Sequence, residues 1–366
     1  MKKLAIIGAS TGQQKICEVA NKMGIYTIGF AWENGAVCKN LFSKFYPISI
    51  SEMDEIVRIC KEEKIDGIVS NGSDYTAKVV NYVANKLQLC GNKYEDFIKA
   101  QNKYYVRDIT NNIKELTPIR TIKVNNINEI FYPCVMKPSI GSSKKGVNFI
   151  ENKKQIQDAY NYAKNESNEV IIEEFVTGKE ISVECLSYKK THKIIQITDK
   201  ETTGAPHFVE LSHQQPAKIS NELKNKLNII IPKILNSINI KNGASHIELK
   251  INDNKIYLIE VNCRGGGDKI SDELIYLSTE FDYIKAIVEI ALDIFKFPKN
   301  IDSKVQCGIC FLCKQNEKIF NSIHTEYKNN IIECNISSDS LIESTSNYDR
   351  NGYIIYRKEL LCKKEL

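Results

Sequence analysis

The chain has 366 residues, of which 42% are hydrophobic and 26% are charged, and its formal net charge is +5. This length predicts two or three domains, and the composition excludes a disordered or fibrous protein. A net charge this small, without a local basic patch, argues against nucleic-acid binding, and no apolar run approaches the roughly 20 residues of a membrane span.

The twelve cysteines are scattered from Cys17 to Cys362 without the spacing of a disulfide framework, which favours a reducing compartment. The apolar run that follows Met1 is interrupted at once by Gly8, so it indicates a strand and not a signal peptide. We therefore expect a cytoplasmic protein.

Residues 1–95 alternate short apolar runs with helical patterns, which predicts repeated βαβ units. The turn Gly8–Gly12 lacks the Gly-x-Gly-x-x-Gly spacing of a dinucleotide site, so a simple strand-to-helix turn is favoured. Strands are expected at Leu4–Ile7, Tyr26–Phe30 and Ile65–Ser70, and helices at Gln13–Met23 and Met53–Lys64.

Residues 96–296 change to longer strands in hairpins with intervening helices, which indicates an α+β domain. Within it, Lys103 and Arg107 lie four residues apart on a helical pattern, so both side chains can point the same way. Either residue alone is also consistent with a solvated pair with Asp108.

A loop of small residues follows the apolar strand that contains Lys137, and it includes Ser142, Ser143 and Lys145. Small residues let backbone N–H groups approach anionic oxygens, and an ammonium group adds a positioned charge. We interpret this segment as a phosphate-covering loop, while a flexible hairpin with solvated lysines remains an equally open interpretation.

A second apolar strand runs into Glu173, Glu174, Phe175 and Val176, with Glu180 just beyond a turn. A purine needs an acceptor for its amine, apolar walls for its ring and a carboxylate near its ribose. The side chains of Glu173 and Glu180 and the backbone of Glu174 and Val176 could fill these places. An exposed edge strand whose charges deter aggregation is the competing interpretation.

Two later runs, residues 245–251 and 255–262, form a predicted antiparallel hairpin. Their apolar odd positions are expected to share one face, which excludes a two-residue turn and favours the three-residue loop Asp253–Lys255. Those positions are Ile247, Leu249 and Ile251 on the first strand, and Tyr257, Ile259 and Val261 on the second.

In this hairpin Glu248 is expected to lie across from Glu260, and His246 across from Asn262. Two opposed carboxylates repel each other unless a cation bridges them, and oxygen ligands on rigid strands suit Mg²⁺. We therefore predict that Glu248, Glu260 and Asn262 bind magnesium. Two solvated glutamates on an exposed face are the alternative.

Arg264, one of only six arginines, follows this strand and precedes three glycines and Asp268. A planar guanidinium binds phosphate or carboxylate oxygens through two hydrogen bonds, whereas the alternative is a surface arginine in a flexible linker. The loop residues His207 and Glu210 are candidate substrate contacts, although a lone loop histidine is more often a surface residue.

The last part of the chain, residues 297–366, predicts a small β-rich subdomain with strands at Val305–Lys314, Ile331–Ile336 and Tyr353–Arg357. Cys307, Cys310 and Cys313 have a spacing known from iron–sulfur clusters. On a strand, however, Cys310 faces away from the other two, which lie roughly 20 Å apart, so a buried strand is favoured.

Five segments, taken in their order along the chain, resemble the ATP-grasp superfamily of carboxylate–amine ligases, including L-amino-acid ligases and carbamoyl-phosphate-synthase-like proteins. They contain Lys103, Lys137 with its loop, Glu173–Glu180, Glu248 and Glu260–Arg264. The resemblance covers residues 100–295 well and the first 95 residues less well. It implies an α/β and α+β fold: a Rossmann-like domain over 1–95, an ATP-grasp domain over 96–296 and a β-rich part over 297–366.

The resemblance also implies roles for individual residues. The implied ATP-binding residues are Lys103, Lys137, Ser142, Ser143, Lys145, Glu173, Glu174, Phe175, Val176 and Glu180. The implied magnesium ligands are Glu248, Glu260 and Asn262, Lys137 and Arg264 are catalytic, and substrate contacts come from His207, Glu210, Arg264, Gly266, Gly267 and Asp268. The sequence departs from the family pattern at Cys263, where proline is common, and in a phosphate loop with fewer glycines than usual.

The implied reaction uses ATP with Mg²⁺ or Mn²⁺, and its partners are small carboxylate and amine substrates, with a homodimer as one allowed assembly. The carboxylate attacks the γ-phosphate, and the amine then displaces phosphate from the acyl phosphate. A loop over residues 139–146 is expected to close and exclude water. The alternatives are a carboxylase-like or ribonucleotide-synthetase-like member, an inactive nucleotide-binding module, and an NAD-linked oxidoreductase.

Overall fold

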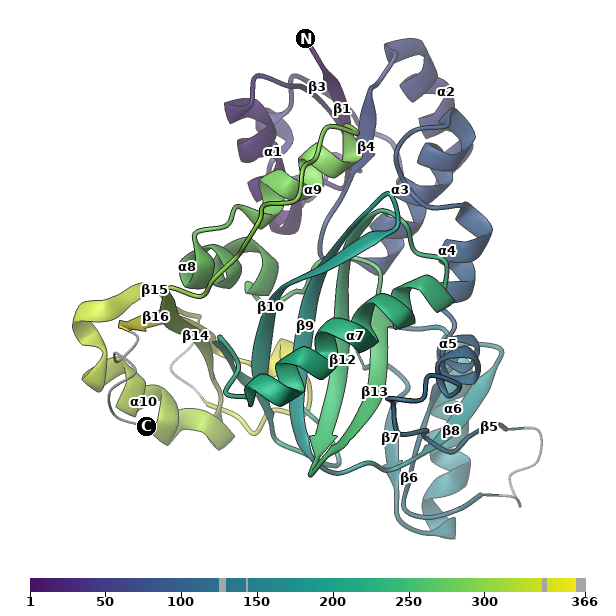
Figure 1. Ribbon diagram of the computed structural model, residues 1–366, viewed down its shortest axis with the longest axis vertical. Coiled ribbons are helices and arrows are strands. Elements are labelled where there is room, and N and C mark those ends of the chain that lie inside the picture. Colours follow the sequence, from purple (N-terminus) through teal and green to yellow (C-terminus); the bar gives the residue numbers. More distant parts are fainter. Residues whose placement is uncertain (125–129, 143, 338–340, 360–366) are drawn as a thin grey trace.

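The computed structural model describes residues 1–124, 130–142, 144–337 and 341–359. Three sheets follow one another in space, with the largest in the middle of the molecule (Figure 1). Mixed helices and strands around a multi-stranded antiparallel sheet confirm the predicted fold class.

The N-terminal sheet is parallel, with the strand order β3-β2-β1-β4. The predicted strands and helices of this region are confirmed, with β3 as an additional strand and β4 shorter than expected. The elements are β1 (Lys3–Ile7), α1 (Thr11–Lys22), β2 (Tyr26–Phe30), β3 (Lys44–Tyr46), α2 (Met53–Glu63), β4 (Gly67–Val69) and α3 (Asp74–Leu87).

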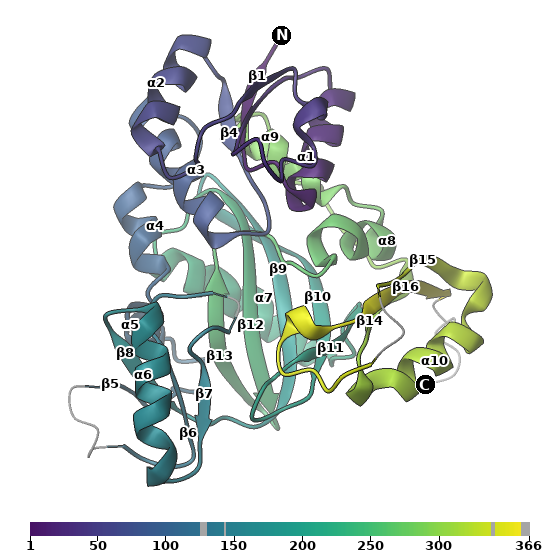
Figure 2. The same cartoon turned by 180° about the vertical axis from the view of Figure 1, so that it is seen from behind.

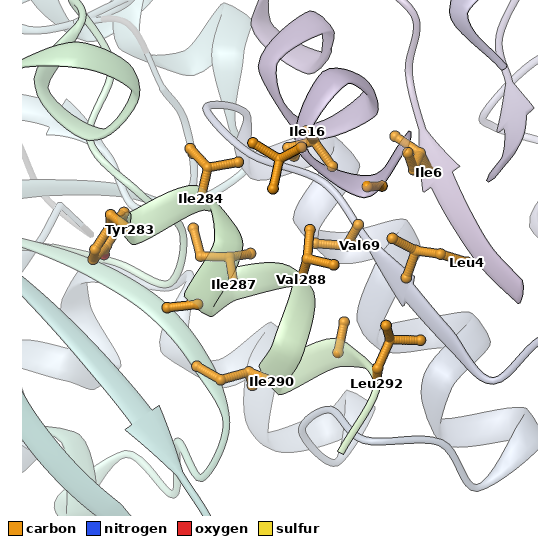
Figure 3. Packing of buried hydrophobic residues seen from close by; sticks show 14 of the residues in the cluster. Leu4, Ile6, Ile16, Val69, Tyr283, Ile284, Ile287, Val288, Ile290 and Leu292 are labelled. Atoms are coloured by element: carbon orange, nitrogen blue, oxygen red, sulfur yellow. The ribbon is translucent and has the colours of Figure 1, made fainter. Parts of the chain in front are cut away.

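Alternate residues of β1 enter two different cores, because successive side chains of a strand point to opposite faces. Ala5 and Ile7 pack with α2 and α3, whereas Leu4 and Ile6 pack with α1. The second core also contains α9 (Tyr283–Ala291), which comes from far along the chain (Figure 3). One face of the N-terminal sheet is therefore covered by α1 and by α9, a helix that comes after the predicted antiparallel hairpin in the chain.

A small antiparallel sheet, with the order β5-β8-β6-β7, lies at one end of the molecule beside α6 (Figure 2). Two short helices connect it to the N-terminal sheet, and its core joins residues of α6 to those of β6 and β8. The elements are α4 (Tyr94–Ala100), α5 (Lys103–Thr110), β5 (Thr121–Lys123), β6 (Cys134–Pro138), β7 (Asn148–Ile150), α6 (Ile156–Glu166) and β8 (Val170–Glu174).

The central sheet is antiparallel and has the order β13-β12-β9-β10-β11-β14-β16-β15. Helix α7 lies across one face and supplies Leu227, Ile230, Ile231, Ile234 and Leu235 to the core beneath it (Figure 1). The elements are β9 (Lys179–Tyr188), β10 (Thr191–Thr202), β11 (Glu210–Gln215), α7 (Asn221–Ser237), β12 (Gly243–Asn252), β13 (Lys255–Asn262), α8 (Ile275–Thr279), β14 (Val305–Leu312), α10 (Glu317–Glu326), β15 (Ile331–Ile336) and β16 (Gly352–Glu359).

The three strands predicted after residue 297 are present, and they extend the central sheet. Cys307 packs on one side of β14 with Ile309, and Cys310 packs on the other side with Leu312, which confirms that these cysteines face opposite ways. Among the described residues, the one cluster with metal-ligand spacing contains no cysteine. The domain boundaries at residues 95 and 296 stay predictions.

The β12–β13 hairpin combines a correct and a wrong prediction. Glu248 pairs with Glu260 and His246 with Asn262, as expected. The predicted three-residue loop is wrong, since Asn252 pairs with Lys255 across a two-residue turn.

A bulge between Glu248 and Leu249 compensates for the shorter turn. A bulge adds one residue to one strand, so it changes which side chains face the core. Consequently Ile256, Leu258 and Val261 enter the core beneath α7, whereas Tyr257 and Ile259 do not. The expectation that the odd positions of β13 share the core face is wrong for these last two residues.

No helix in the described part of the chain has the length and apolar character needed to cross a membrane.

Candidate active site

Two neighbouring cavities meet at the β12–β13 hairpin. The first cavity lies between this hairpin and the small sheet, and its lining includes Lys137, Phe175 and Glu180. The second cavity lies on the other side, where the lining includes Arg264 and Asp268. Among the residues that the structure describes, four line both cavities: Ser142, Lys144, Glu248 and Glu260.

The first cavity has the apolar walls that were expected of a purine site. The ring of Phe175 lies 4.6 Å from the ring of Phe149 and 6.2 Å from that of Phe208. Ile259, which the bulge turns out of the core, lines the same cavity. The aromatic and aliphatic side chains together suit a flat heterocyclic ring.

The backbone groups near Phe175 are partly used within the protein. The N–H of Glu174 donates to the carbonyl of Arg120 at 3.0 Å, and the carbonyl of Val176 accepts a hydrogen bond from Lys250 at 3.2 Å. Glu180 lines the cavity and pairs with Lys200 at 3.6 Å.

Glu173 is buried in an ion-pair cluster and does not present a free acceptor. Its carboxylate lies 3.0 Å from Arg107 and 2.5 Å from Lys137. Burial alone would raise the pKa of Glu173, but the charges of Arg107 and Lys137 outweigh it and hold the pKa at about 2. Burial also lowers the pKa of Lys137 against the opposing attraction of Glu173. Glu173 therefore holds two cations in place at the edge of the first cavity.

Arg107 is buried at the edge of the site, which its sequence pattern did not predict. Besides its pair with Glu173, it donates hydrogen bonds to the carbonyls of Leu258 and Ile259 on β13. Arg107 thereby ties α5 and the small sheet to the hairpin. Its helical spacing from Lys103 was the one signal in the sequence, but it did not identify the partners.

The predicted phosphate loop is tied down at both ends. Lys103 donates to the carbonyl of Gly141 at 2.7 Å, and Lys144 reaches across to the carbonyl of Phe208 at 2.6 Å. Ser142 and Lys145 are exposed residues that line the first cavity, whereas Ser143 lies outside the described residues. These two contacts thus tie Gly141 and Lys144 to neighbouring segments at the first cavity.

Each carboxylate of the opposed pair is held by a lysine. Lys103 lies 3.0 Å from Oε1 of Glu260, and Lys200 lies 2.7 Å from Oε1 of Glu248. Asn262 follows on the same strand and lines the second cavity. Two carboxylates and an amide on adjacent strands form an oxygen donor set of the type that Mg²⁺ prefers, so these residues fit the predicted metal.

Lys200, which no motif in the sequence singled out, lines the second cavity and contacts carboxylates that line either cavity. Its side chain is 1% exposed and lies 3.2 Å from Glu210 in addition to its contacts with Glu248 and Glu180. Burial would lower the pKa of Lys200, but these three carboxylates raise it well above its ordinary value. Only its position within an otherwise buried strand could have singled it out.

Glu184 explains the glycine at position 266. This buried carboxylate hydrogen-bonds His246 through Oε1 and accepts the backbone N–H of Gly266 at 3.0 Å through Oε2. A Cβ at position 266 would lie 2.8 Å from both Glu184 Oε1 and His246 Nδ1. Gly266 is therefore needed for close packing, while Gly267 lines the second cavity and has open space around it.

Arg264 lines the second cavity and is oriented by the N-terminal part of the chain. Its Nε donates to Asp74 Oδ1 at 3.0 Å and its Nη2 to Oδ2 at 3.4 Å. Asp74 is the first residue of α3, so a helix that packs on the N-terminal sheet contributes directly to the site. The guanidinium is held by this two-point contact at the cavity wall.

The remaining predicted substrate residues divide between two places. Glu210 and Asp268 line the second cavity and approach Nε2 of the buried His213 at 3.6 and 3.5 Å. Burial lowers the pKa of His213, but the two carboxylates raise it above its ordinary value. His207 is exposed and lines a separate outer crevice.

Part of the chain is similar in sequence to known proteins. Residues 130–273 match the ATP-grasp domain family. Over 202 residues the chain is 27% identical to a D-alanine–D-alanine ligase of Flavobacterium johnsoniae, which covers 54% of this chain and 59% of that protein. The chain spans about half the length of the curated ligases that it matches.

Solved structures share the fold over nearly the whole chain. An L-amino acid ligase from Bacillus licheniformis aligns with a TM-score of 0.81 at 19% identity, covering 98% of this chain and 94% of that one. An N5-carboxyaminoimidazole synthetase from Staphylococcus aureus complexed with ADP aligns with a TM-score of 0.76 at 16% identity, covering 98% and 93%.

Proposed function

We propose that this protein is an ATP-dependent carboxylate–amine ligase acting on an amino acid or a small acid, because residues 130–273 match the ATP-grasp domain family. One observation carries the proposal. Glu248 and Glu260 face each other on adjacent strands and line both cavities, so they lie where a nucleotide and a second substrate would meet.

The first cavity is the proposed nucleotide site. The aromatic ring of Phe175 and the aliphatic Ile259 pack on the adenine, and Lys103 and Lys137 bind phosphate oxygens. Glu248, Glu260 and Asn262 would hold Mg²⁺, which would supply positive charge to offset the charge on the transferring phosphoryl group.

The second cavity is the proposed site of the carboxylate and the amine. An oxygen of the carboxylate attacks the γ-phosphorus of ATP, and the bond between that phosphorus and the bridging oxygen of ADP breaks. The amine nitrogen then attacks the carbonyl carbon of the acyl phosphate, loses a proton and displaces inorganic phosphate. Arg264, oriented by Asp74, stabilises the negative charge on the reacting oxygens.

The phosphate loop protects the intermediate. An acyl phosphate hydrolyses in water, so the site must exclude solvent during the reaction. Lys144 donates to the carbonyl of Phe208, and both residues line the first cavity. This contact supports a closed loop during catalysis.

The proposal is tested by Glu260→Gln and Arg264→Ala. Both should lower the rate of ADP formation by about 100-fold or more, because each removes a charged group from the reacting centre. ADP and phosphate release are measured with ATP, Mg²⁺ and pairs of amino acids or small acids. The exposed Glu317→Gln is the control, and circular dichroism checks the fold. Full activity of both site variants would refute the assignment.

A further inference from the structure

Residues 344–350, here called the C-terminal segment, lie against the second cavity although they follow β15 near the end of the chain. Figure 2 shows this yellow stretch of chain beside β11. Within it, Asn347 lines the second cavity together with residues of the central sheet. The segment is therefore part of the wall of the proposed substrate site.

Asn347 forms hydrogen bonds with both the backbone and the side chain of Glu210. Its Oδ1 accepts the backbone N–H of Glu210 at 2.9 Å, and its Nδ2 donates to Glu210 Oε2 at 3.2 Å. Glu210 also contacts Lys144 and Lys200, each at 3.2 Å. The Asn347 amide thus fixes the Glu210 carboxylate, which contacts both Lys144 of the phosphate loop and the buried Lys200.

Arg350 holds the other acidic residue of this wall. Its Nη1 and Nη2 donate to the two oxygens of Asp268, each at 2.9 Å, and its Nε donates to the carbonyl of Asn347 at 2.8 Å. The guanidinium stacks on the ring of Phe311 at 3.7 Å. A planar group with this many fixed contacts has one orientation, so Arg350 positions both Asp268 and Asn347.

Asn347 also stands at a boundary. It lines both the second cavity and the outer crevice, as Lys144 does. The outer crevice continues past Phe208 and Tyr348 toward solvent, and Tyr348 is 77% exposed. A substrate longer than the second cavity would therefore reach the outer crevice at Asn347 and Lys144.

We propose that the C-terminal segment determines substrate size, with Asn347 closing the second cavity toward the outer crevice and Arg350 positioning it. This inference rests on the proposed ligase function and names the class of substrate. The second cavity is lined mostly by charged and polar side chains, including Lys200, Glu210 and Asp268, so it suits a small zwitterion such as a single amino acid. A dipeptide would reach into the crevice.

The test compares the wild type with Asn347→Ala. Phosphate release is measured with ATP, Mg²⁺ and a fixed carboxylate, using either single amino acids or the matching dipeptides as the amine. Asn347→Ala should raise the ratio of kcat/KM for dipeptides to that for amino acids about tenfold, with KM for ATP unchanged. Asn329→Ala, an exposed asparagine in the same part of the chain, should leave the ratio unchanged.

Arg350→Lys tests the positioning role, since it keeps the charge and loses the two-point contact. It should raise KM for the amine severalfold with KM for ATP unchanged, and Arg350→Ala should raise it further. Suppose that the wild type is active, that Asn347→Ala has the wild-type substrate ratio and that Arg350→Lys has the wild-type KM for the amine. This result would overturn the inference about the C-terminal segment and leave the proposed function standing. A wild type that releases no phosphate with any pair would overturn the proposed function and this inference with it.

Discussion

At the scale of single residues, the site is an array of buried charges in which each group depends on its partners. Lys200 shows this most clearly, because three carboxylates from three strands converge on one ammonium group. Removing one member of a buried ion cluster leaves the others uncompensated, which costs more than the pair contributed. The stability of the central sheet is therefore linked to the chemistry of the site.

Lys200→Met should lower the free energy of unfolding by about 3 to 5 kcal/mol, because Glu180, Glu210 and Glu248 would repel one another without their shared cation. Urea titration of the purified variant measures this change. Lys224→Met, on the exposed face of α7, is the matched control and should leave the midpoint unchanged. An equal midpoint in the two variants would contradict the role assigned to Lys200.

Glu173 makes a pH-dependent contribution whose sign follows from its lowered pKa. The folded pKa is about 2, below the value of about 4.3 for an unfolded glutamate. The stabilisation is therefore complete above the unfolded pKa, amounts to about 3 kcal/mol, and is lost as the pH falls toward 2.

Glu173→Gln should accordingly be less stable than the wild type at pH 7, and the difference should shrink as the pH is lowered from 5 toward 2. Denaturant titrations of both proteins across this range measure the difference. A difference that stays constant with pH would show that the Glu173 carboxylate is not stabilised by Arg107 and Lys137.

At the scale of secondary-structure elements, close approaches depend on glycine. A Cβ at Gly67, in β4, would lie 2.4 Å from the carbonyl oxygen of Ala291 at the end of α9. Both atoms belong to or adjoin the backbone, so a rotamer change cannot relieve the clash. The helix would have to move away from the N-terminal sheet.

Gly67→Ala should therefore destabilise the protein by about 1 to 3 kcal/mol, as overpacking of a tight contact does. Gly12→Ala is the control, and it should stabilise the protein. It lies in α1 with no atom closer than 3.7 Å to a new Cβ, and alanine favours the helix by up to about 1 kcal/mol. Thermal denaturation followed by circular dichroism compares the two, and a stabilised Gly67→Ala would contradict the packing described.

In the β12–β13 hairpin the predicted pairing of the two glutamates is correct, although the predicted turn length is wrong. The alternation of apolar residues correctly set Glu248 opposite Glu260, yet the turn has two residues and not three. One residue fewer in the turn is offset by one residue more in the bulge of β13. The bulge is an unpaired residue without a sequence signature here, so periodicity alone could not reveal it.

At the scale of the whole molecule, the N-terminal sheet and the central sheet share one core through α9. Ile284, Ile287 and Val288 of this helix pack in the same cluster as Leu4 and Ile6 of β1 (Figure 3). The cluster also contains Leu186 and Ala244 of the central sheet. The predicted boundary at residue 95 separates chain segments that fold against a common helix.

A fragment of residues 1–95 should therefore fold poorly by itself, because the face of its sheet that α9 covers would be exposed to water. We expect poorly dispersed amide resonances and strong binding of a hydrophobic dye. Fusing residues 280–296 to the fragment through a flexible linker should restore a folded spectrum. A well-dispersed spectrum from residues 1–95 alone would contradict the dependence on α9.

The sequence by itself determined the strands and helices predicted within residues 1–70, the three strands after residue 297 and the pairing of Glu248 with Glu260. These features depend on short-range periodicity, which is visible within a dozen residues. The charge partners were decided only by the tertiary structure. Lys200 meets Glu248 across 48 residues, Arg107 meets Glu173 across 66, and Arg350 meets Asp268 across 82. The order of strands in the sheets brings these residues together although they are far apart in the sequence. The role of a buried charge can be recognised only when the groups that neutralise it are known.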